Sequence, residues 1–154
     1  MKAIILSIKK QYSEAILSGI KKCELRRSPF PRDVDIVIIY SSNHVGLITG
    51  WFTIQSRIEG SPEEIWKQFS KEAYITKDEF DKYYEGATKG VCLVIDTFQR
   101  LEPPINPTTE LREFVAPQSF MYPRDSDWVI FEERIPPLQN QTLDSHFGKL
   151  FDNG

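Results

Sequence analysis

Residues 18–27 read SGIKKCELRR, a stretch that places four cations around one carboxylate. Three of its side chains have chemistry suited to a polar or anionic ligand: Lys21, Glu24 and Arg26. The planar guanidinium of Arg26 can form paired hydrogen bonds to a phosphate or to the edge of a base, and Lys21 offers a point cation. The carboxylate of Glu24 accepts hydrogen bonds from an amine. The stretch is therefore either a ligand-binding edge or a solvated run of charge.

The distribution of charge along the chain bears on this choice. The 154 residues carry a formal net charge of −3, which argues against indiscriminate binding of long nucleic-acid backbones. Residues 1–32 nevertheless contain eight Lys and Arg against two Asp and Glu, whereas residues 33–154 contain eleven against twenty. This asymmetry favours a localised anion-binding face near the charged stretch.

Length and composition limit the class of protein. A chain of 154 residues fits one domain with a substantial core. No apolar run reaches the roughly 18 residues of a membrane span, and the short apolar run at residues 2–8 is not followed by a signal-peptide cleavage site. We therefore expect a cytoplasmic protein with no membrane partner.

The cysteines and histidines indicate no metal site. Cys23 and Cys92 are too few for a paired-cysteine metal site, and His44 and His146 lack metal-ligand spacing. We therefore expect free thiols, no metal and no cofactor.

The elements that position the charged stretch follow from the hydrophobic pattern. The apolar run 2–8 predicts a buried strand, and apolar residues at three- and four-residue steps predict a helix over 10–18. Gly19 then stands where a helix needs a left-handed residue to end. Residues 23–27 predict a short strand, so the charged stretch spans a helix end and the strand that follows it.

Alternation along this short strand divides its side chains between two faces. Cys23 and Leu25 are expected to point toward the core, while Lys22, Glu24 and Arg26 point the other way. The strand thus anchors itself with one face and presents charge on the other.

The remaining elements are predicted from apolar runs and capping residues. Ser61 and Thr76 each begin a capping box and predict two successive helices, and Asn106 before a proline predicts a third, short one. Apolar and β-branched runs predict further strands at residues 35–40, 46–58, 90–101 and 127–133.

These elements indicate an α+β fold. Strands bracket one early helix and a central helical insert, and most connections are too short for regular βαβ crossovers. The sequence therefore predicts a small, mostly antiparallel β-barrel decorated by helices over residues 1–134. Residues 135–154 form a polar, proline-containing tail with apolar residues at helical spacing. We expect this tail either to dock on the domain as a short helix or to engage a protein partner.

Gly19, Lys21, Glu24 and Arg26 together spell G-x-K-x-x-E-x-R. This pattern resembles the signature of the ASCH domain, a member of the PUA-like superfamily of small β-barrels linked to RNA. Four further segments carry the resemblance, which covers residues 1 to about 133. They are LSIKKQYSEAILSG, with Lys9 at a customary basic position, YSS at 40–42, the helical segment 61–86 and APQSF at 116–120. The last two are similar to a subgroup described as transcriptional regulators with a PUA-like domain.

The resemblance implies a cleft beside the first helix that accepts RNA or a nucleotide-like small ligand. The motif residues Lys21, Glu24 and Arg26 would line or support this cleft, with Glu24 able to accept from an exocyclic amine. Alternatively, Glu24 and Arg26 pair with each other or with Lys22 and hold the strand in place. Further candidates are hydroxyl and amide groups at a strand end and in a proline-flanked loop. The expected ligand-binding residues are Lys9, Lys21, Glu24, Arg26, Ser41, Ser42, Gln118 and Ser119.

Some ASCH relatives are amide hydrolases that act on acetylated cytidine, using a motif Lys, a Thr three residues later and a distant Glu. Here Lys21 matches the Lys, Glu24 replaces the Thr, and Glu72 or Glu79 is available as the distant Glu. The replacement removes a hydroxyl nucleophile and favours a protonated lysine. The leading hypothesis is therefore a regulatory domain that binds RNA or a modified nucleotide. The alternative is a nucleic-acid-processing hydrolase, a ribonuclease or an acetylcytidine-type amidohydrolase, with Lys21 and Glu24 as its catalytic pair.

Overall fold

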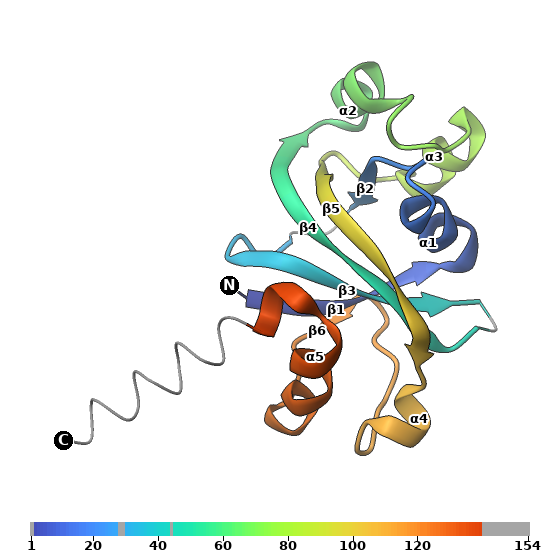
Figure 1. The fold of residues 1–154 in the computed structure, drawn as a ribbon. Helices are drawn as coiled ribbons and strands as arrows, with labels where there is room; N and C mark the ends of the chain where they lie inside the picture. The colour runs from blue at the N-terminus through green and yellow to red at the C-terminus, as the bar shows by residue number, and fades with distance from the viewer. Residues whose placement is uncertain (1, 28–29, 44, 140–154) are drawn as a thin grey trace.

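The computed structural model describes residues 2–27, 30–43 and 45–139 (Figure 1). A short strand and helix open the chain, a pair of helices interrupts the middle, and a final helix closes the described part. The elements are β1 (Lys2–Lys9), α1 (Lys10–Leu17), β2 (Cys23–Arg26), β3 (Val34–Ser42), β4 (Leu47–Gly60), α2 (Pro62–Phe69), α3 (Lys77–Tyr83), β5 (Gly90–Ile105), α4 (Pro107–Glu110), β6 (Phe120–Met121), a 3-10 turn (Asp125–Asp127) and α5 (Trp128–Arg134).

Six strands form one curled sheet in the order β2-β5-β4-β3-β1-β6. The pair β1–β3 is parallel and the other pairs are antiparallel. The two longest strands, β4 and β5, have register shifts along their shared ladder, which bend a sheet and increase its twist. The result is a half-barrel with helices packed around it (Figure 1), which confirms the predicted α+β class.

The helix α1 packs on one face of this sheet. It begins directly after β1 and ends where Gly19 takes a φ of +79°, as the sequence predicts. Ile16 and Leu17 are buried in a core cluster with residues of β1, β3, β4 and β5. Any side chain at Gly50 of β4 would place its Cβ 2.6 Å from a methyl group of Leu17, so only glycine allows the helix to lie this close.

The helices α2 and α3 form an insert between β4 and β5, and both begin as predicted. The Ser61 side chain accepts a hydrogen bond from the Glu64 N–H at 3.2 Å, and Thr76 accepts one from the Glu79 N–H at 3.2 Å. The insert lies at the opposite end of the molecule from α4 and α5 (Figure 1). Its apolar side chains pack on β2 and β5 in a cluster of Cys23, Leu25, Ile65, Ala73, Phe80, Tyr84 and Cys92.

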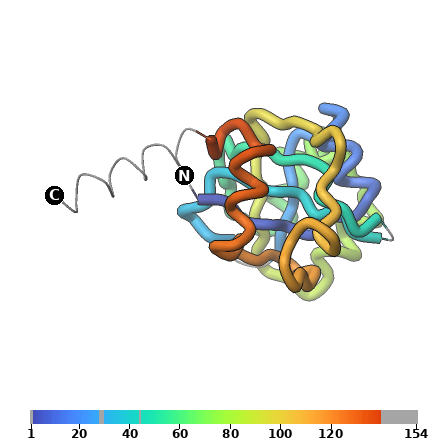
Figure 2. The backbone as a smooth tube through the Cα atoms, turned by 60° about the horizontal axis from the view of Figure 1, so that its bottom comes forward, coloured from blue at the N-terminus to red at the C-terminus, as the bar shows by residue number. Residues whose placement is uncertain are grey.

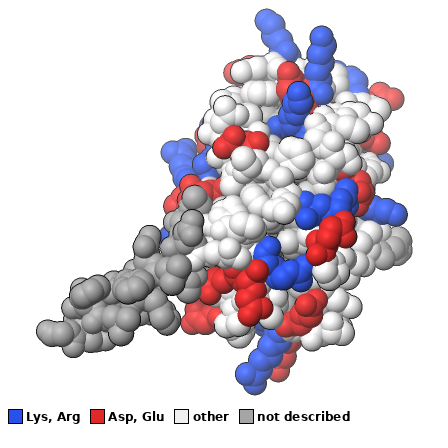
Figure 3. All heavy atoms as spheres, viewed as in Figure 1, with Lys and Arg blue, Asp and Glu red and all other residues white. Residues whose placement is uncertain are grey.

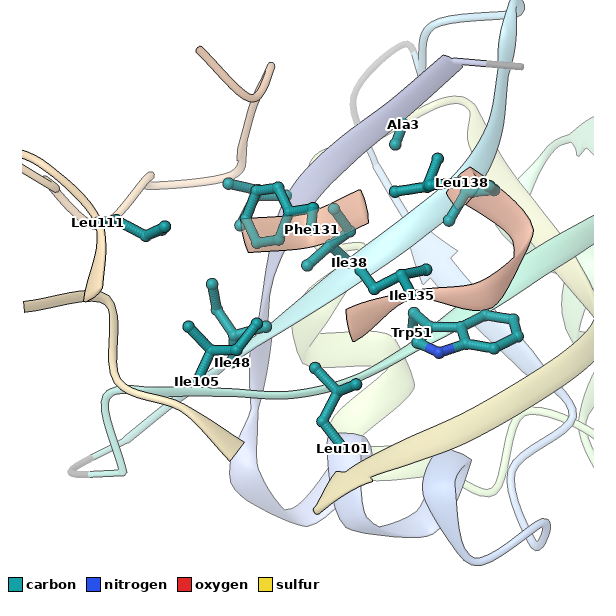
Figure 4. Close-up of a cluster of buried hydrophobic side chains, with 12 residues drawn as sticks. Ala3, Ile38, Ile48, Trp51, Leu101, Ile105, Leu111, Phe131, Ile135 and Leu138 are labelled. Carbon is teal, nitrogen blue, oxygen red and sulfur yellow. The ribbon is translucent and has the colours of Figure 1, made fainter. Parts of the chain in front are cut away.

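The segment 127–133 was expected to be a strand, and this expectation is wrong. A 3-10 turn leads into α5, and the fully buried Asp127 accepts hydrogen bonds from the Arg124 backbone and guanidinium, which fixes the turn. Phe131, Ile135 and Leu138 then follow at steps of four and three residues. All three are buried against the sheet (Figure 4). A short apolar run fits either element by periodicity, and here the helical spacing beyond the run decides.

The packing of α5 covers the face of the sheet opposite α1. Figure 2 shows this helix in front of the strands, and Figure 4 shows Phe131 and Ile135 beside Ile38 and Trp51. The burial continues through Leu138, beyond the expected domain end at residue 134. The helical spacing expected in the tail falls on residues that lie outside the described part of the chain. Every helix within the described ranges is too short or too polar to span a bilayer.

Replacing Phe131 with Ala tests whether α5 is part of the core. Phe131 is fully buried, so its truncation leaves a cavity and is expected to reduce the free energy of unfolding by about 3–5 kcal/mol. Val129 on the same helix is 62% exposed, and Val129→Ala should change it by no more than about 0.5 kcal/mol. Urea denaturation measures both variants, and equal effects would contradict the assignment of α5 to the core.

Candidate functional site

A cleft of about 880 Å³ lies where α1, β2, α3 and the loop before β6 meet. We call it the motif cleft because the G-x-K-x-x-E-x-R residues enter it. Its wall combines side chains from the N-terminal third of the chain with side chains of the helical insert. Of the predicted site residues, six line it: Lys9, Lys21, Glu24, Arg26, Ser42 and Gln118.

Glu24 is a buried carboxylate at the base of this cleft. The strand β2 pairs with β5 so that Cys23 and Leu25 enter the core cluster under the insert, as alternation predicted, and Glu24 turns toward the cleft. Its side chain lies 3.8 Å from the Arg26 guanidinium through Oε1. Oε2 is buried and has no hydrogen-bond partner in the part of the chain that the structure describes. Burial raises the pKa of Glu24, although the charges of Lys21 and Arg26 act in the opposite direction.

Lys21 is also buried, with 3% of its surface exposed. Its ammonium donates a hydrogen bond to the Ala73 carbonyl in the turn between α2 and α3, and it lies 4.9 Å from the centre of the Tyr12 ring. The Lys21 backbone N–H bonds the Ala15 carbonyl at 3.0 Å, which closes the end of α1. The side chain therefore connects α1, the cleft and the helical insert.

Arg26 reaches from β2 to the loop that precedes β6. Its Nη2 donates to Ser119 Oγ at 2.8 Å, and this loop is itself held on β1 by the hydrogen bond from the Ser7 hydroxyl to the Pro117 carbonyl at 2.6 Å. The predicted closing loop is thus fixed at the edge of the motif cleft, with Gln118 in the lining and Ser119 on Arg26.

Two other predicted residues differ in their positions. Ser41 is almost fully buried and shares a 2.8 Å hydrogen bond with Ser13, so it joins β3 to α1 behind the cleft wall. Lys9 is exposed at the junction of β1 and α1, where it lines the cleft opening. The structure therefore brings Lys9 to the cleft and leaves Ser41 outside its lining.

The cleft residues that were not predicted include Tyr12, Tyr83 and Lys82. The Tyr12 hydroxyl donates to Glu79 Oε2 at 2.8 Å, and burial together with this carboxylate raises the pKa of Tyr12 to about 12. Burial also raises the pKa of Tyr83, whose hydroxyl donates to the Leu25 carbonyl at 3.2 Å. Both tyrosines have the helical spacing of core residues, and no local pattern shows that α3 packs beside β2.

The cleft chemistry suits a polar ligand with a planar part. Tyr12, Tyr40 and Tyr83 supply aromatic surface, the exposed lysines and Arg26 supply cations, and Glu24 supplies an acceptor.

On the face drawn in Figure 3, charges of both signs are interspersed, with no continuous basic surface. Among the described residues, no group of three His, Cys, Asp or Glu side chains is placed to hold a metal ion. Cys23 and Cys92 are buried free thiols.

The chain is similar in sequence and in fold to known proteins. The family model described as ASCH domain matches residues 6–134. An ASCH domain-containing ribonuclease of Zymomonas mobilis is 27% identical over 133 residues, which are 86% of this chain and 87% of that protein. The crystal structure of an ASCH protein from the same organism superimposes with a TM-score of 0.74 at 25% identity, over 80% of this chain and 89% of that one. The N-terminal domain of McrB from Staphylothermus marinus has a TM-score of 0.54 at 11% identity, over 86% of this chain and 93% of that domain.

The raised pKa of Glu24 predicts how stability depends on pH. The folded state binds a proton at Glu24 more readily than the unfolded state, whose carboxyl titrates near about 4.3. The stability due to this proton is complete below that value and is lost as the pH rises through the folded pKa. Glu24→Gln should therefore match the wild type at low pH and become increasingly more stable than the wild type as the pH rises.

Urea denaturation between pH 4 and pH 8 measures this difference. Glu59→Gln is the matched control, because Glu59 is an exposed carboxylate on β4 whose ion pair with Arg32 is a surface pair. Its difference from the wild type should be small across the range. A Glu24→Gln variant that becomes less stable than the wild type at high pH would contradict the assignment.

Proposed function

The chain belongs to the ASCH domain family, as its motifs predicted, and from this premise we propose that the motif cleft binds one nucleotide unit of RNA. In this proposal Glu24 recognises the base and Arg26 contacts the base edge or a phosphate. Lys21 connects α1 to the helical insert and also faces the ligand. The function is regulatory recognition of RNA, in the cytoplasm that the sequence predicts.

The observation that carries the proposal is the buried Oε2 atom of Glu24. A buried acceptor without a partner costs stability, and native proteins satisfy nearly all such atoms. A ligand that places an N–H donor at this atom would complete the hydrogen bonding. The exocyclic amines and ring N–H groups of nucleobases are donors of this kind, and Glu accepts from the cytosine amine in nucleic-acid complexes.

The neighbouring residues support a nucleotide over a simple amine. Arg26 has five N–H donors, and within the described residues its hydrogen bond to Ser119 occupies one of them. The others are suited to a phosphate or a base edge. Tyr12 and Tyr83 line the same cleft, and aromatic side chains are the usual stacking surface for unpaired RNA bases.

A second candidate function is cleavage of the bound RNA. The relative from Zymomonas mobilis that matches 86% of this chain is named a ribonuclease. Burial raises the pKa of Glu24, and a raised carboxyl pKa suits a general base near neutral pH. Glu24 would take the proton of a ribose 2′-hydroxyl, and the 2′-oxygen would form a bond to phosphorus. The bond from phosphorus to the 5′-oxygen would break, and this oxygen would take up a proton. The products are a 2′,3′-cyclic phosphate and a 5′-hydroxyl.

Hydrolysis of acetylated cytidine receives less support. The position of the family's hydroxyl nucleophile is Glu24, and the Lys21 ammonium is already a hydrogen-bond donor to the Ala73 carbonyl. A lysine used as a donor in this way is placed to carry a proton and not to remove one.

Arg26→Ala tests the binding proposal. A hydrogen bond from a charged group contributes about 1.5–3 kcal/mol. Its loss in Arg26→Ala should therefore lower the RNA affinity by roughly 10- to 150-fold. Lys22→Ala is the matched control, since Lys22 is the exposed cation next to the motif lysine and lies outside the motif cleft. Fluorescence anisotropy with a short labelled RNA at one fixed salt concentration measures both variants. Equal affinities for the two variants would contradict the proposal.

Glu24→Gln separates binding from cleavage. If the wild type cleaves RNA, this variant should lose about 10²- to 10⁴-fold in rate, because the general base is gone while the shape of the side chain is kept. Denaturing gels follow the products, and the wild-type products should carry cyclic phosphate ends. Intact RNA after prolonged incubation with the wild type would exclude cleavage of that RNA and leave the binding role. Undiminished cleavage by the variant would show that Glu24 is not the base.

A further inference from the structure

A second cleft of about 540 Å³ adjoins the motif cleft. It lies between the start of α1 and the turn that joins α2 to α3, and we call it the turn cleft. Four residues line both clefts: Gln11, Tyr12, Ile75 and Glu79. The hydrogen bond from Tyr12 to Glu79 therefore lies on the boundary between two contiguous binding spaces.

We propose that the turn cleft binds the nucleotide next to the one in the motif cleft, with Tyr74 stacking on its base and Lys71 facing its phosphate. This inference rests on the proposed function and makes it more specific. The ligand is a single-stranded RNA with at least two successive nucleotides, and a free nucleoside fills only part of the site.

Tyr74 has the properties of a stacking surface. Its side chain is 54% exposed although it is large and aromatic, and its φ of +48° is rare for a residue with a bulky side chain. Backbone strain of this kind is commonly found where a side chain is held for binding. Stacking on an exposed aromatic ring is tolerant of base identity and is a main source of affinity for single strands.

The turn that carries Tyr74 is fixed to the motif. The preceding residue, Ala73, is buried in the cluster under the insert, and its carbonyl accepts the hydrogen bond from the Lys21 ammonium. The Lys22 backbone N–H also donates to the Glu72 carbonyl at 2.7 Å. Tyr74 is therefore held in a defined position relative to Lys21 and Glu24, which reduces the entropy lost when a ligand spans both clefts.

The charges around the turn cleft fit a phosphate on its outer side. Lys71 is exposed in the lining, and the hydroxyls of Ser70 and Thr76 add polar groups. Glu79 is the acidic residue of this lining, and its carboxylate accepts the hydrogen bond from Tyr12, which directs it toward the boundary of the two clefts. The cation and the aromatic ring are the two elements that single-strand binding requires.

The test compares ligands of two lengths. Tyr74→Ala should weaken binding of a fluorescein-labelled single-stranded RNA octamer of mixed sequence by about 5- to 150-fold, the range expected for loss of one stacked base. It should leave binding of the four nucleoside 5′-monophosphates, measured by calorimetry, within about twofold. Tyr74→Phe retains the ring and should retain the octamer affinity. A gel after each titration checks that the octamer is intact.

Tyr122→Ala is the matched control, because Tyr122 is 51% exposed and lies outside the lining of both clefts. It should not change octamer binding. Unchanged octamer affinity in Tyr74→Ala, or equal weakening for both ligand lengths, would overturn the two-nucleotide inference while Arg26→Ala still tests the motif cleft. A wild type that binds monophosphates as tightly as the octamer would also overturn it. A wild type that binds neither would overturn both proposals.

Discussion

The burial of charge on one face of β2 is the constraint on which the site depends. The two charged residues of this short strand, Glu24 and Arg26, line the motif cleft, as does Lys21, which lies two residues before the strand. Removing a carboxylate from water is unfavourable, and this burial raises the pKa of Glu24 while the charges of Lys21 and Arg26 act in the opposite direction. In the proposed function, a ligand N–H donor at Oε2 would supply the hydrogen bond that this buried atom lacks among the described residues.

The helical insert makes this burial structurally possible. β2 is an edge strand of four residues, paired on one side only, to β5. Its apolar face packs under the insert through Cys23 and Leu25, and Ala73 of the insert accepts the hydrogen bond from Lys21. The insert therefore covers one face of this edge strand and forms part of the wall of the motif cleft.

Local signals predicted the parts of the structure that local physics determines. The capping residues Ser61 and Thr76 and the helix end at Gly19 act within one turn, and alternation along β2 follows from strand geometry. The prediction of a strand at 127–133 was wrong because a short apolar run fits a strand and a helix equally well. Its residues pack on the sheet as a helix. The places of Tyr83 in the cleft lining and of Ser41 behind it depend on which elements pack together, information that no short stretch contains.

The position of Lys21 makes Arg26 the better residue for a test of binding. Its ammonium has three N–H donors, and one of them bonds the Ala73 carbonyl while the group also faces the Tyr12 ring. Removing this side chain would leave a buried carbonyl and a loosened turn, so its effect on RNA affinity combines folding with recognition. The Arg26 side chain is 15% exposed and is held by the hydroxyl of Ser119, in a loop that β1 already fixes. The loss of Arg26 therefore changes the cations presented to the ligand while the turn that carries Tyr74 stays in place.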